Sequence, residues 1–142
     1  MRVSDYMTPN PATIHLKDNL RTAIDLMIQV GRRLPVVDDN GKLLGIITDR
    51  DLRLAMNSPL IPHPPEDDQE LLAKTVVEEV MTYPVITTRP DVWLDQAATI
   101  MLENNVSGLP VLDKRNKLVG IISVSDLLRA LIHTYEDEAL NE

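Results

Sequence analysis

Hydrophobic positions in the first third of the chain predict a helix, a hairpin and a second helix. Five apolar residues lie three or four positions apart, as on one face of a helix: Leu20, Ala23, Ile24, Met27 and Ile28. Two apolar runs of strand length follow at 34–37 and 43–48, and the Asn-Gly pair between them favours the backbone angles of a hairpin turn. A second helix is expected from about Asp49 to Met56.

The same series of elements occurs a second time. Met7-Thr8 recurs as Met81-Thr82. An offset of 74 residues aligns the first part of the two copies, and an offset of 75 residues aligns their second part, from Leu34 onward. The second helical face consists of Leu94, Ala97, Ala98, Met101 and Leu102. Strands are expected at 109–112 and 118–123, and a helix over about 124–132. With a short extended segment at its start, each copy is predicted to be strand, helix, strand, strand, helix.

These copies predict an α/β (α+β) fold with four segments. Residues 1–57 form the first repeat, 58–75 a proline-rich and acidic linker, 76–135 the second repeat and 136–142 an acidic tail. The prolines of the linker favour an extended path, followed by a short acidic helix. A repeat of about 55 residues buries too little surface to be stable alone. We therefore expect the two β-α-β-β-α repeats to pack sheet to sheet, with pseudo-twofold symmetry, around a shared core.

The net charge of -8 comes from two short segments and not from the repeats themselves. Four acidic residues lie within 66–70 and four within 136–142, which leaves 14 acidic and 14 basic residues elsewhere. A protein that binds nucleic acid would carry a basic face and, for single strands, stacking aromatic residues. The chain has one Trp, three Tyr and no Phe, so no nucleic acid partner is expected.

The sequence also lacks the signals of several other classes of protein. No apolar run approaches the roughly 20 residues that span a bilayer, and the first residues do not have the pattern of a signal peptide. We therefore expect a cytoplasmic protein without a membrane partner. There is no cysteine, and His15, His63 and His133 have no ligand spacing, so no metal site is expected. No nucleophile and base pattern and no Walker-type phosphate loop occurs, so no catalytic residue and no enzyme activity is expected.

The junction between the second strand and the second helix of each repeat carries the candidate chemistry. It places a hydroxyl three residues before an aspartate, Thr48 before Asp51 and Ser123 before Asp126. A carboxylate at a helix start can accept hydrogen bonds from ribose hydroxyls, while the hydroxyl and the helix amides suit a phosphate. The same spacing occurs in helix-capping boxes, in which the two side chains satisfy unpaired amides. Both interpretations remain open at this point.

Both junctions resemble the signature of the CBS domain, which is glycine, two apolar residues, Thr or Ser, two variable residues and Asp. The resemblance extends from Val3 to His133 and includes the Leu-Pro-Val strands and the Met-Thr starts. A tandem pair of CBS domains is known as a Bateman module. In the family these positions contact the sugar and phosphate of adenosine nucleotides, and the resemblance implies that role for Thr48, Asp51, Ser123 and Asp126. The chain is also similar to stand-alone bacterial proteins of the acetoin-utilisation type.

The resemblance adds further candidate ligand contacts. Basic residues next to the first motif would face the ligand phosphates: Arg32, Arg33 and Arg50. Four residues at equivalent positions of the two repeats complete the set: Thr13, Thr87, Pro35 and Pro110. The counterparts of the arginines in the second repeat are uncharged. Of the two clefts expected between the repeats, the one that uses this Arg-rich segment is therefore expected to prefer a charged nucleotide, with Mg²⁺ when it is ATP, and the other to bind weakly, to take a less charged adenosyl ligand or to stay empty.

The function implied by the resemblance is regulation by an adenine nucleotide, without a cofactor and through an unidentified protein partner. Three alternatives stay open: a structural dimerisation module with empty clefts, a binder of another adenosyl ligand such as S-adenosylmethionine or NADH, and catalysis on a nucleotide. A homodimer is also expected, because the family pairs through amphipathic helices. The apolar helix residues available for this interface are Leu20, Ile24, Met27 and Ile28 with Leu127, Leu128, Leu131 and Ile132.

Overall fold

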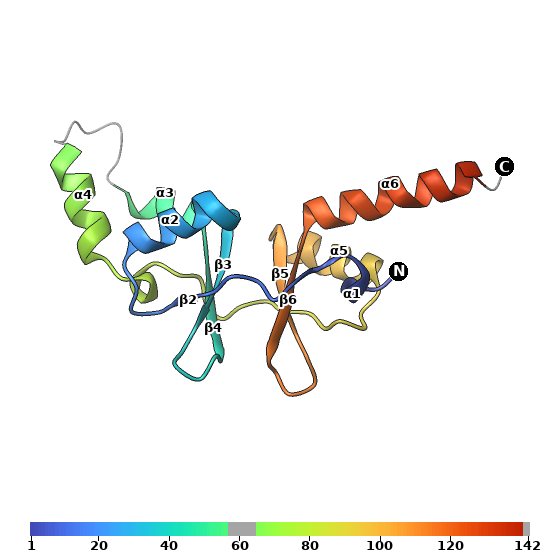
Figure 1. The fold of residues 1–142 in the computed structure, drawn as a ribbon, viewed down its shortest axis with the longest axis horizontal. Coiled ribbons are helices and arrows are strands. Elements are labelled where there is room, and N and C mark those ends of the chain that lie inside the picture. The colour runs from blue at the N-terminus through green and yellow to red at the C-terminus, as the bar shows by residue number, and fades with distance from the viewer. Residues whose placement is uncertain (57–64, 141–142) are drawn as a thin grey trace. The chain divides into compact units, whose positions relative to one another are not determined.

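Two compact units make up the structure, a computed structural model that describes residues 1–56 and 65–140. The first unit consists of residues 12–85 and the second of residues 1–11 and 86–142. Each unit combines one three-stranded sheet with helices (Figure 1). The mixed α/β fold expected from the two repeats is therefore confirmed.

The first unit is built around a sheet of order β2-β3-β4. Its elements are β2 (Ile14–His15), α2 (Leu20–Val30), β3 (Arg33–Val37), β4 (Leu43–Thr48), α3 (Asp49–Ala55), α4 (Pro65–Lys74) and the 3-10 helix η1 (Val77–Glu79). Strand β2 runs parallel to β3, and β3 pairs antiparallel with β4 so that Leu34 lies opposite Ile47. Both side chains are fully buried and belong to one core with Leu20 of α2. The hairpin and the two helices expected in the first repeat are confirmed.

The second unit is built in the same way around a sheet of order β1-β6-β5. Its elements are α1 (Val3–Tyr6), β1 (Thr8–Pro9), α5 (Leu94–Asn104), β5 (Gly108–Leu112), β6 (Leu118–Ser123) and α6 (Val124–Leu140). Strands β5 and β6 are antiparallel, and Leu109 lies opposite Ile122. These two residues are fully buried in a core that includes Ala97 of α5. The two repeats therefore share one hairpin register as well as one order of elements.

The Met-Thr pair that begins each repeat lies on the sheet of the other repeat. Thr8 pairs with β6, and Thr82 forms an antiparallel bridge with Ile46 of β4. The Met81-Thr82 segment lies so close to β4 that a Cβ on Gly45 would be 2.5 Å from the Sδ of Met81. Because every other residue type has a Cβ, the close approach of Met81 accounts for the glycine of the motif.

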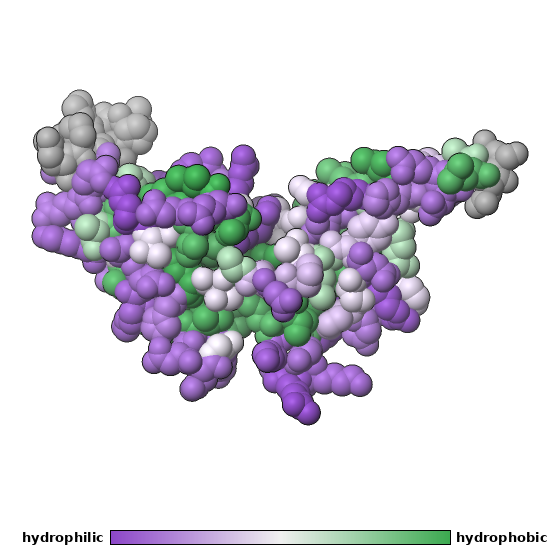
Figure 2. Space-filling view, in the orientation of Figure 1, coloured by the Kyte–Doolittle hydropathy of each residue, from purple (hydrophilic) through white to green (hydrophobic). Residues whose placement is uncertain are grey.

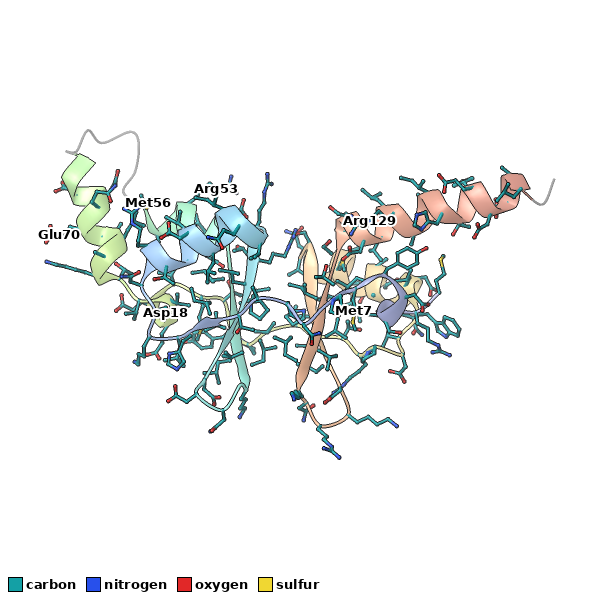
Figure 3. All side chains as sticks on the ribbon, in the orientation of Figure 1. Met7, Asp18, Arg53, Met56, Glu70 and Arg129 are labelled. Carbon is teal, nitrogen blue, oxygen red and sulfur yellow. The ribbon has the colours of Figure 1, made fainter. Side chains whose placement is uncertain are left out.

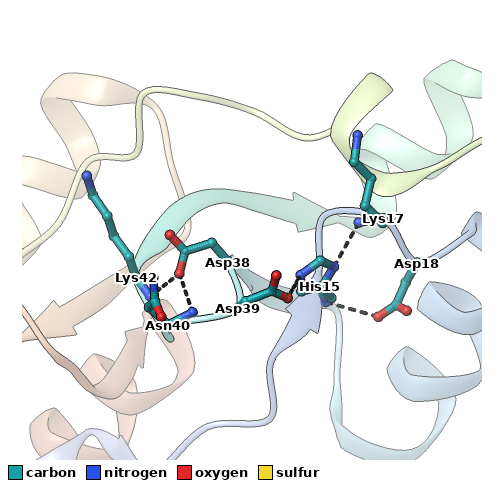
Figure 4. A network of polar contacts seen from close by, with 7 residues as sticks. All are labelled: His15, Lys17, Asp18, Asp38, Asp39, Asn40 and Lys42. Atoms are coloured by element: carbon teal, nitrogen blue, oxygen red, sulfur yellow. Dashed lines mark hydrogen bonds and ion pairs between the residues drawn. The ribbon is translucent and has the colours of Figure 1, made fainter.

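Aspartates shape the turns of both hairpins. Asp38 Oδ1 accepts hydrogen bonds from the backbone N–H groups of Asn40 (2.9 Å) and Lys42 (3.0 Å) (Figure 4). In the second hairpin the backbone N–H of Lys117 donates to Asp113 and lowers the pKa of that carboxyl below its usual value. The turns are thus fixed by local hydrogen bonds, which positions the strand ends that carry the motifs.

Helix α6 is longer than the sequence predicts. The apolar spacing predicts a helix that ends near residue 132, but α6 continues to Leu140. Its last turns, 133–140, are mostly exposed and need no apolar periodicity, since adding residues to a helix that is already nucleated costs little. The expected helix end is therefore wrong. None of the described helices, α6 included, is long and apolar enough to cross a membrane.

The linker between the repeats contributes helix α4 to the first unit. The acidic helix expected in this segment is confirmed, whereas the extended stretch expected over 58–64 lies outside the described residues. Leu72 of α4 is buried in the first core, and Asn19 Nδ2 donates to the carbonyl of Ala73 (3.3 Å). Helix α4 therefore packs against α2, and the described part of the second unit has no equivalent helix.

Thr88 is a polar residue at an apolar position of the second core. It is 5% exposed, and its hydroxyl has no hydrogen-bond partner among the described residues. The equivalent residue of the first unit is Ile14, which is also buried. Thr88→Val should therefore raise the free energy of unfolding by about 1 kcal/mol, because it removes a buried unpaired hydroxyl and keeps the shape of the side chain.

Urea unfolding of wild type and Thr88→Val measures this gain. Thr99→Val is the control, since Thr99 is exposed on α5 and its substitution should leave stability nearly unchanged. Lower stability of Thr88→Val than of wild type would contradict the prediction, because it would show that the hydroxyl makes a stabilising interaction.

Candidate functional site

The β4–α3 junction of the first unit brings the motif together with basic residues. Strand β4 ends at Thr48 and α3 starts at Asp49, with no loop between them. In the β3–β4 register Arg33 is paired with Thr48, and the N–H of Asp49 donates to the carbonyl of Arg32 (3.1 Å). Arg50 is exposed on the first turn of α3. The three arginines predicted as phosphate contacts therefore lie at the same end of the sheet as the motif.

A capping box holds Asp51 in place. Its Oδ2 accepts hydrogen bonds from the backbone N–H (2.8 Å) and the hydroxyl (3.1 Å) of Thr48. In return the N–H of Asp51 donates to Thr48 Oγ1 (3.3 Å). The capping interpretation left open by the sequence is thus present in the structure. Since the only proton of the Thr48 hydroxyl is directed to Asp51, this hydroxyl has no proton to donate to a phosphate.

Thr82 is a contact of Asp51 that the sequence did not predict. Thr82 Oγ1 donates to Asp51 Oδ1 (3.0 Å). The signal for it is the Met-Thr pair at the start of each repeat, although the pattern does not say which sheet the pair joins. Three hydrogen bonds from described residues now occupy a carboxylate that has roughly four acceptor sites. Oδ1 of Asp51 therefore keeps capacity for one further donor, such as a ribose hydroxyl.

The second unit repeats this geometry with a different third partner. Asp126 Oδ2 accepts hydrogen bonds from the N–H (2.7 Å) and the hydroxyl (3.1 Å) of Ser123. Its Oδ1 forms an ion pair with Arg129, which lies on the next turn of α6 (Figure 3). Asp126 is 2% exposed, so Arg129 neutralises a buried charge. The comparison of the two repeats does not predict this ion pair, because the residue equivalent to Arg129 in the first repeat is Leu54. The spacing of three residues between Asp126 and Arg129 on one helix would have predicted it.

A hollow of about 480 Å³ lies next to Asp51 within the first unit. The described residues that line it include two carboxylates, Asp51 and Glu79, and no cation. A phosphate would be repelled there, since two like charges at close range interact unfavourably. This hollow is therefore unsuited to a phosphate group.

The remaining predicted contacts lie on the neighbouring strands. Pro35 in β3 and Pro110 in β5 are fully buried, but they alternate with the core residues of their strands and so lie on the opposite face of each sheet. The β2–β3 register places Thr13 level with Pro35, and an isolated parallel bridge places Thr87 level with Pro110. Thr13 is exposed and Thr87 half-buried. Both threonines thus lie near the sheet end that carries the motif, whereas the two prolines are not accessible to a ligand in this structure.

Comparison with known proteins identifies one family. The CBS domain family matches residues 3–58 and 77–133, which are the two repeats. A CBS domain-containing protein of Dictyostelium discoideum is 43% identical over 135 residues, which cover 94% of this chain and 93% of that protein.

Solved structures of CBS-pair proteins share the fold. The CBS domain pair of protein MJ0100, in complex with 5′-methylthioadenosine and S-adenosyl-L-methionine, has a TM-score of 0.79 and 32% identity, over 94% of this chain and 98% of that one. CBSX2 of Arabidopsis thaliana in complex with AMP has a TM-score of 0.77 and 30% identity, over 94% and 98%. A putative acetoin utilization protein from Vibrio cholerae has a TM-score of 0.78 and 33% identity, over 100% and 98%. Two of these three structures contain an adenosyl ligand.

Proposed function

This chain belongs to the CBS domain family as a tandem pair of such domains, and from that premise we propose that it is a regulatory module that binds an adenine nucleotide and catalyses no reaction. The observation that carries the proposal is the doubled strand-to-helix motif, with Arg32 and Arg33 beside Thr48 in the first unit. Adenosyl ligands in two proteins of the same fold support it. The proposed ligands are AMP, ADP and ATP.

In the proposed first site, charge holds the phosphates and hydrogen bonds hold the ribose. Arg32 and Arg50 are exposed beside the junction, and a guanidinium can hold two phosphate oxygens at once. A ribose hydroxyl would bind Asp51 Oδ1, either beside the Thr82 hydroxyl or in its place. The capping box keeps the carboxylate oriented for this contact before the ligand arrives.

Competition for Asp51 gives the proposed module a way to pass on a signal. Thr82 lies on the segment of chain that leads from the first unit to the second, and its backbone is bridged to Ile46. A ribose that takes the place of the Thr82 hydroxyl removes one of the contacts that fix this segment. Binding would therefore shift the equilibrium between two positions of the segment, and a partner protein would respond to that shift.

The second unit offers less to a phosphate. Arg129 is engaged with Asp126, and the residues equivalent to Arg32 and Arg50 are Ser107 and Ser125. Hydroxyl groups make weaker contacts to phosphate than a guanidinium does. We expect this site to bind a nucleotide weakly, to take a less charged adenosyl ligand such as S-adenosylmethionine, or to stay empty.

Thermal melting with AMP, ADP, ATP, S-adenosylmethionine and NADH tests the proposed function. A ligand at 100 times its dissociation constant should add about 2.7 kcal/mol to folded-state stability, which raises Tm by several degrees. The absence of a shift with all five compounds would contradict the proposal and favour a dimerisation module with empty clefts. ATP hydrolysis by wild type that is lost in Asp51→Ala would contradict the proposed lack of catalysis.

We further propose that the chain works in the cytoplasm as a homodimer. Apolar side chains on the helices of both units are exposed, among them Ile28, Leu102, Leu128, Leu131 and Ile132. Leu20, expected from the sequence at an interface, is fully buried in the first core, so that expectation is wrong. Exposed apolar residues gathered on helix faces are typical of protein interfaces. Light scattering at micromolar concentration should give twice the 15.9 kDa mass of the chain, and a monomer mass would contradict the dimer.

A further inference from the structure

Arg129 lies on the acceptor atom that a ribose would need in the second unit. Its guanidinium donates to Asp126 Oδ1, while the two hydrogen bonds from Ser123 go to Asp126 Oδ2. Asp126 is 2% exposed, whereas the side chain of Arg129 is 58% exposed. The guanidinium therefore lies between Oδ1 and the solvent. Figure 2 shows hydrophilic residues at the start of α6, where Arg129 is labelled in Figure 3.

The equivalent carboxylate of the first unit has a neutral group in this place. Asp51 Oδ1 accepts a hydrogen bond from the hydroxyl of Thr82 (3.0 Å), and Asp51 is half-buried. The residue equivalent to Arg129 is Leu54, which is 74% exposed and has no group that can donate to a carboxylate. The two motifs therefore share a hydrogen-bond pattern at Oδ2 and differ in the charge of the group on Oδ1.

A ribose hydroxyl can replace the two groups with unequal ease. At Asp51 it would exchange one hydroxyl-to-carboxylate hydrogen bond for another of the same kind, so little is lost. At Asp126 it would break an ion pair and leave a buried carboxylate without its counter-charge, which is strongly unfavourable. A neutral sugar brings no charge that could compensate. The ion pair of Asp126 therefore resists replacement by a ribose.

We propose that Arg129 is a specificity-determining residue that closes the second motif to ribose, so that the chain binds one nucleoside although it carries two copies of the motif. Arg129 acts through Asp126, whose Oδ1 it occupies, and does not contact the ligand. The inference rests on the proposed function, because it requires that the first motif binds a nucleotide. It adds the residue that keeps the second motif empty.

An exchange of the two equivalent residues tests this role. Arg129→Leu gives the second motif the residue of the first, and Leu54→Arg does the reverse. Equilibrium dialysis with radiolabelled adenosine counts the bound nucleosides, and adenosine has no phosphate that an arginine could attract. Wild type should bind one adenosine per chain and Arg129→Leu two. Leu54→Arg should bind adenosine at least tenfold more weakly than wild type, since a spacing of three residues brings the new guanidinium to Asp51.

Three controls separate this role from a general effect on the fold. Arg115→Leu removes an exposed arginine of the β5–β6 turn and should still bind one adenosine per chain. Leu54→Arg changes an exposed side chain, so its result does not depend on the stability of Arg129→Leu. Urea unfolding measures the ion pair without any ligand. Arg129→Leu should lower the urea midpoint of wild type, and by less than half as much in a chain that already carries Asp126→Asn.

Each other outcome has a defined meaning. Weaker binding by Arg129→Leu would overturn the proposal, because Arg129 would then contact the ligand. Equal stoichiometry in wild type and Arg129→Leu, or equal shifts of the urea midpoint in the two backgrounds, would overturn it too. So would unchanged adenosine affinity in Leu54→Arg. Thermal shifts with ATP on the same variants report separately on the proposed function, which stands if ATP stabilises wild type while the exchange of residues has no effect.

Discussion

Asp126→Ala should lower the free energy of unfolding by about 2–4 kcal/mol, a large effect for the removal of one polar side chain. Asp126 is buried, accepts two hydrogen bonds from Ser123 and pairs with Arg129. Alanine would leave the Ser123 N–H without its acceptor and would remove the acidic residue from the start of α6. Urea unfolding followed by circular dichroism measures the loss.

Asp51→Ala is the matched control for this prediction. Asp51 forms the same capping box, but it is half-buried and its third partner is the hydroxyl of the exposed Thr82. We expect a loss of about 1–2 kcal/mol, because the freed groups can be hydrated. Equal losses in the two variants would show that the burial of Asp126 and its ion pair add nothing to stability.

Arg32→Ala combined with Arg50→Ala should raise the dissociation constant for ATP at least tenfold, because a hydrogen bond to a charged group contributes about 1.5–3 kcal/mol. Both side chains are exposed at the end of the sheet that carries the motif, so their removal should leave the fold intact. Isothermal titration calorimetry with ATP measures the change, and urea unfolding checks that stability is unaffected.

Adenosine separates the phosphate contacts from the rest of the site. It has no phosphate, so the double variant should bind it as wild type does. Arg115→Ala, at an exposed arginine on the β5–β6 turn, should leave the affinity for ATP unchanged. Undiminished ATP affinity in the double variant would show that these arginines do not hold phosphate, and an equal loss for ATP and adenosine would show a general effect on the site.

The sequence predicts most elements of the repeats because their signals are local. Apolar runs of strand length separated by Asn40-Gly41 define the first hairpin, and Gly41 has a φ of +79° in the structure. In the second hairpin Asn116 occupies the equivalent position with a φ of +61°. Internal repetition doubles each signal, so the same elements are found twice.

The features that the sequence did not predict depend on tertiary contacts. Two-residue strands such as β1 have no periodicity, so the pattern cannot say that Thr8 joins the sheet of the other repeat. The Thr82 contact with Asp51 follows from the corresponding placement of the second Met-Thr pair. Arg129 is missed because a comparison of equivalent positions finds only what the repeats share. The end of α6 is missed because exposed polar turns carry no apolar pattern.

Calorimetric titration with ATP of wild type, Asp51→Asn and Asp126→Asn tests the central claim most directly. Asparagine keeps the size of the side chain and one acceptor oxygen, so it perturbs the capping boxes less than alanine does. We predict saturable binding by wild type, a loss of affinity of about tenfold in Asp51→Asn and little change in Asp126→Asn, because the first unit carries the arginines that can hold phosphate. No binding of ATP by wild type, or equal losses in the two variants, would contradict this account.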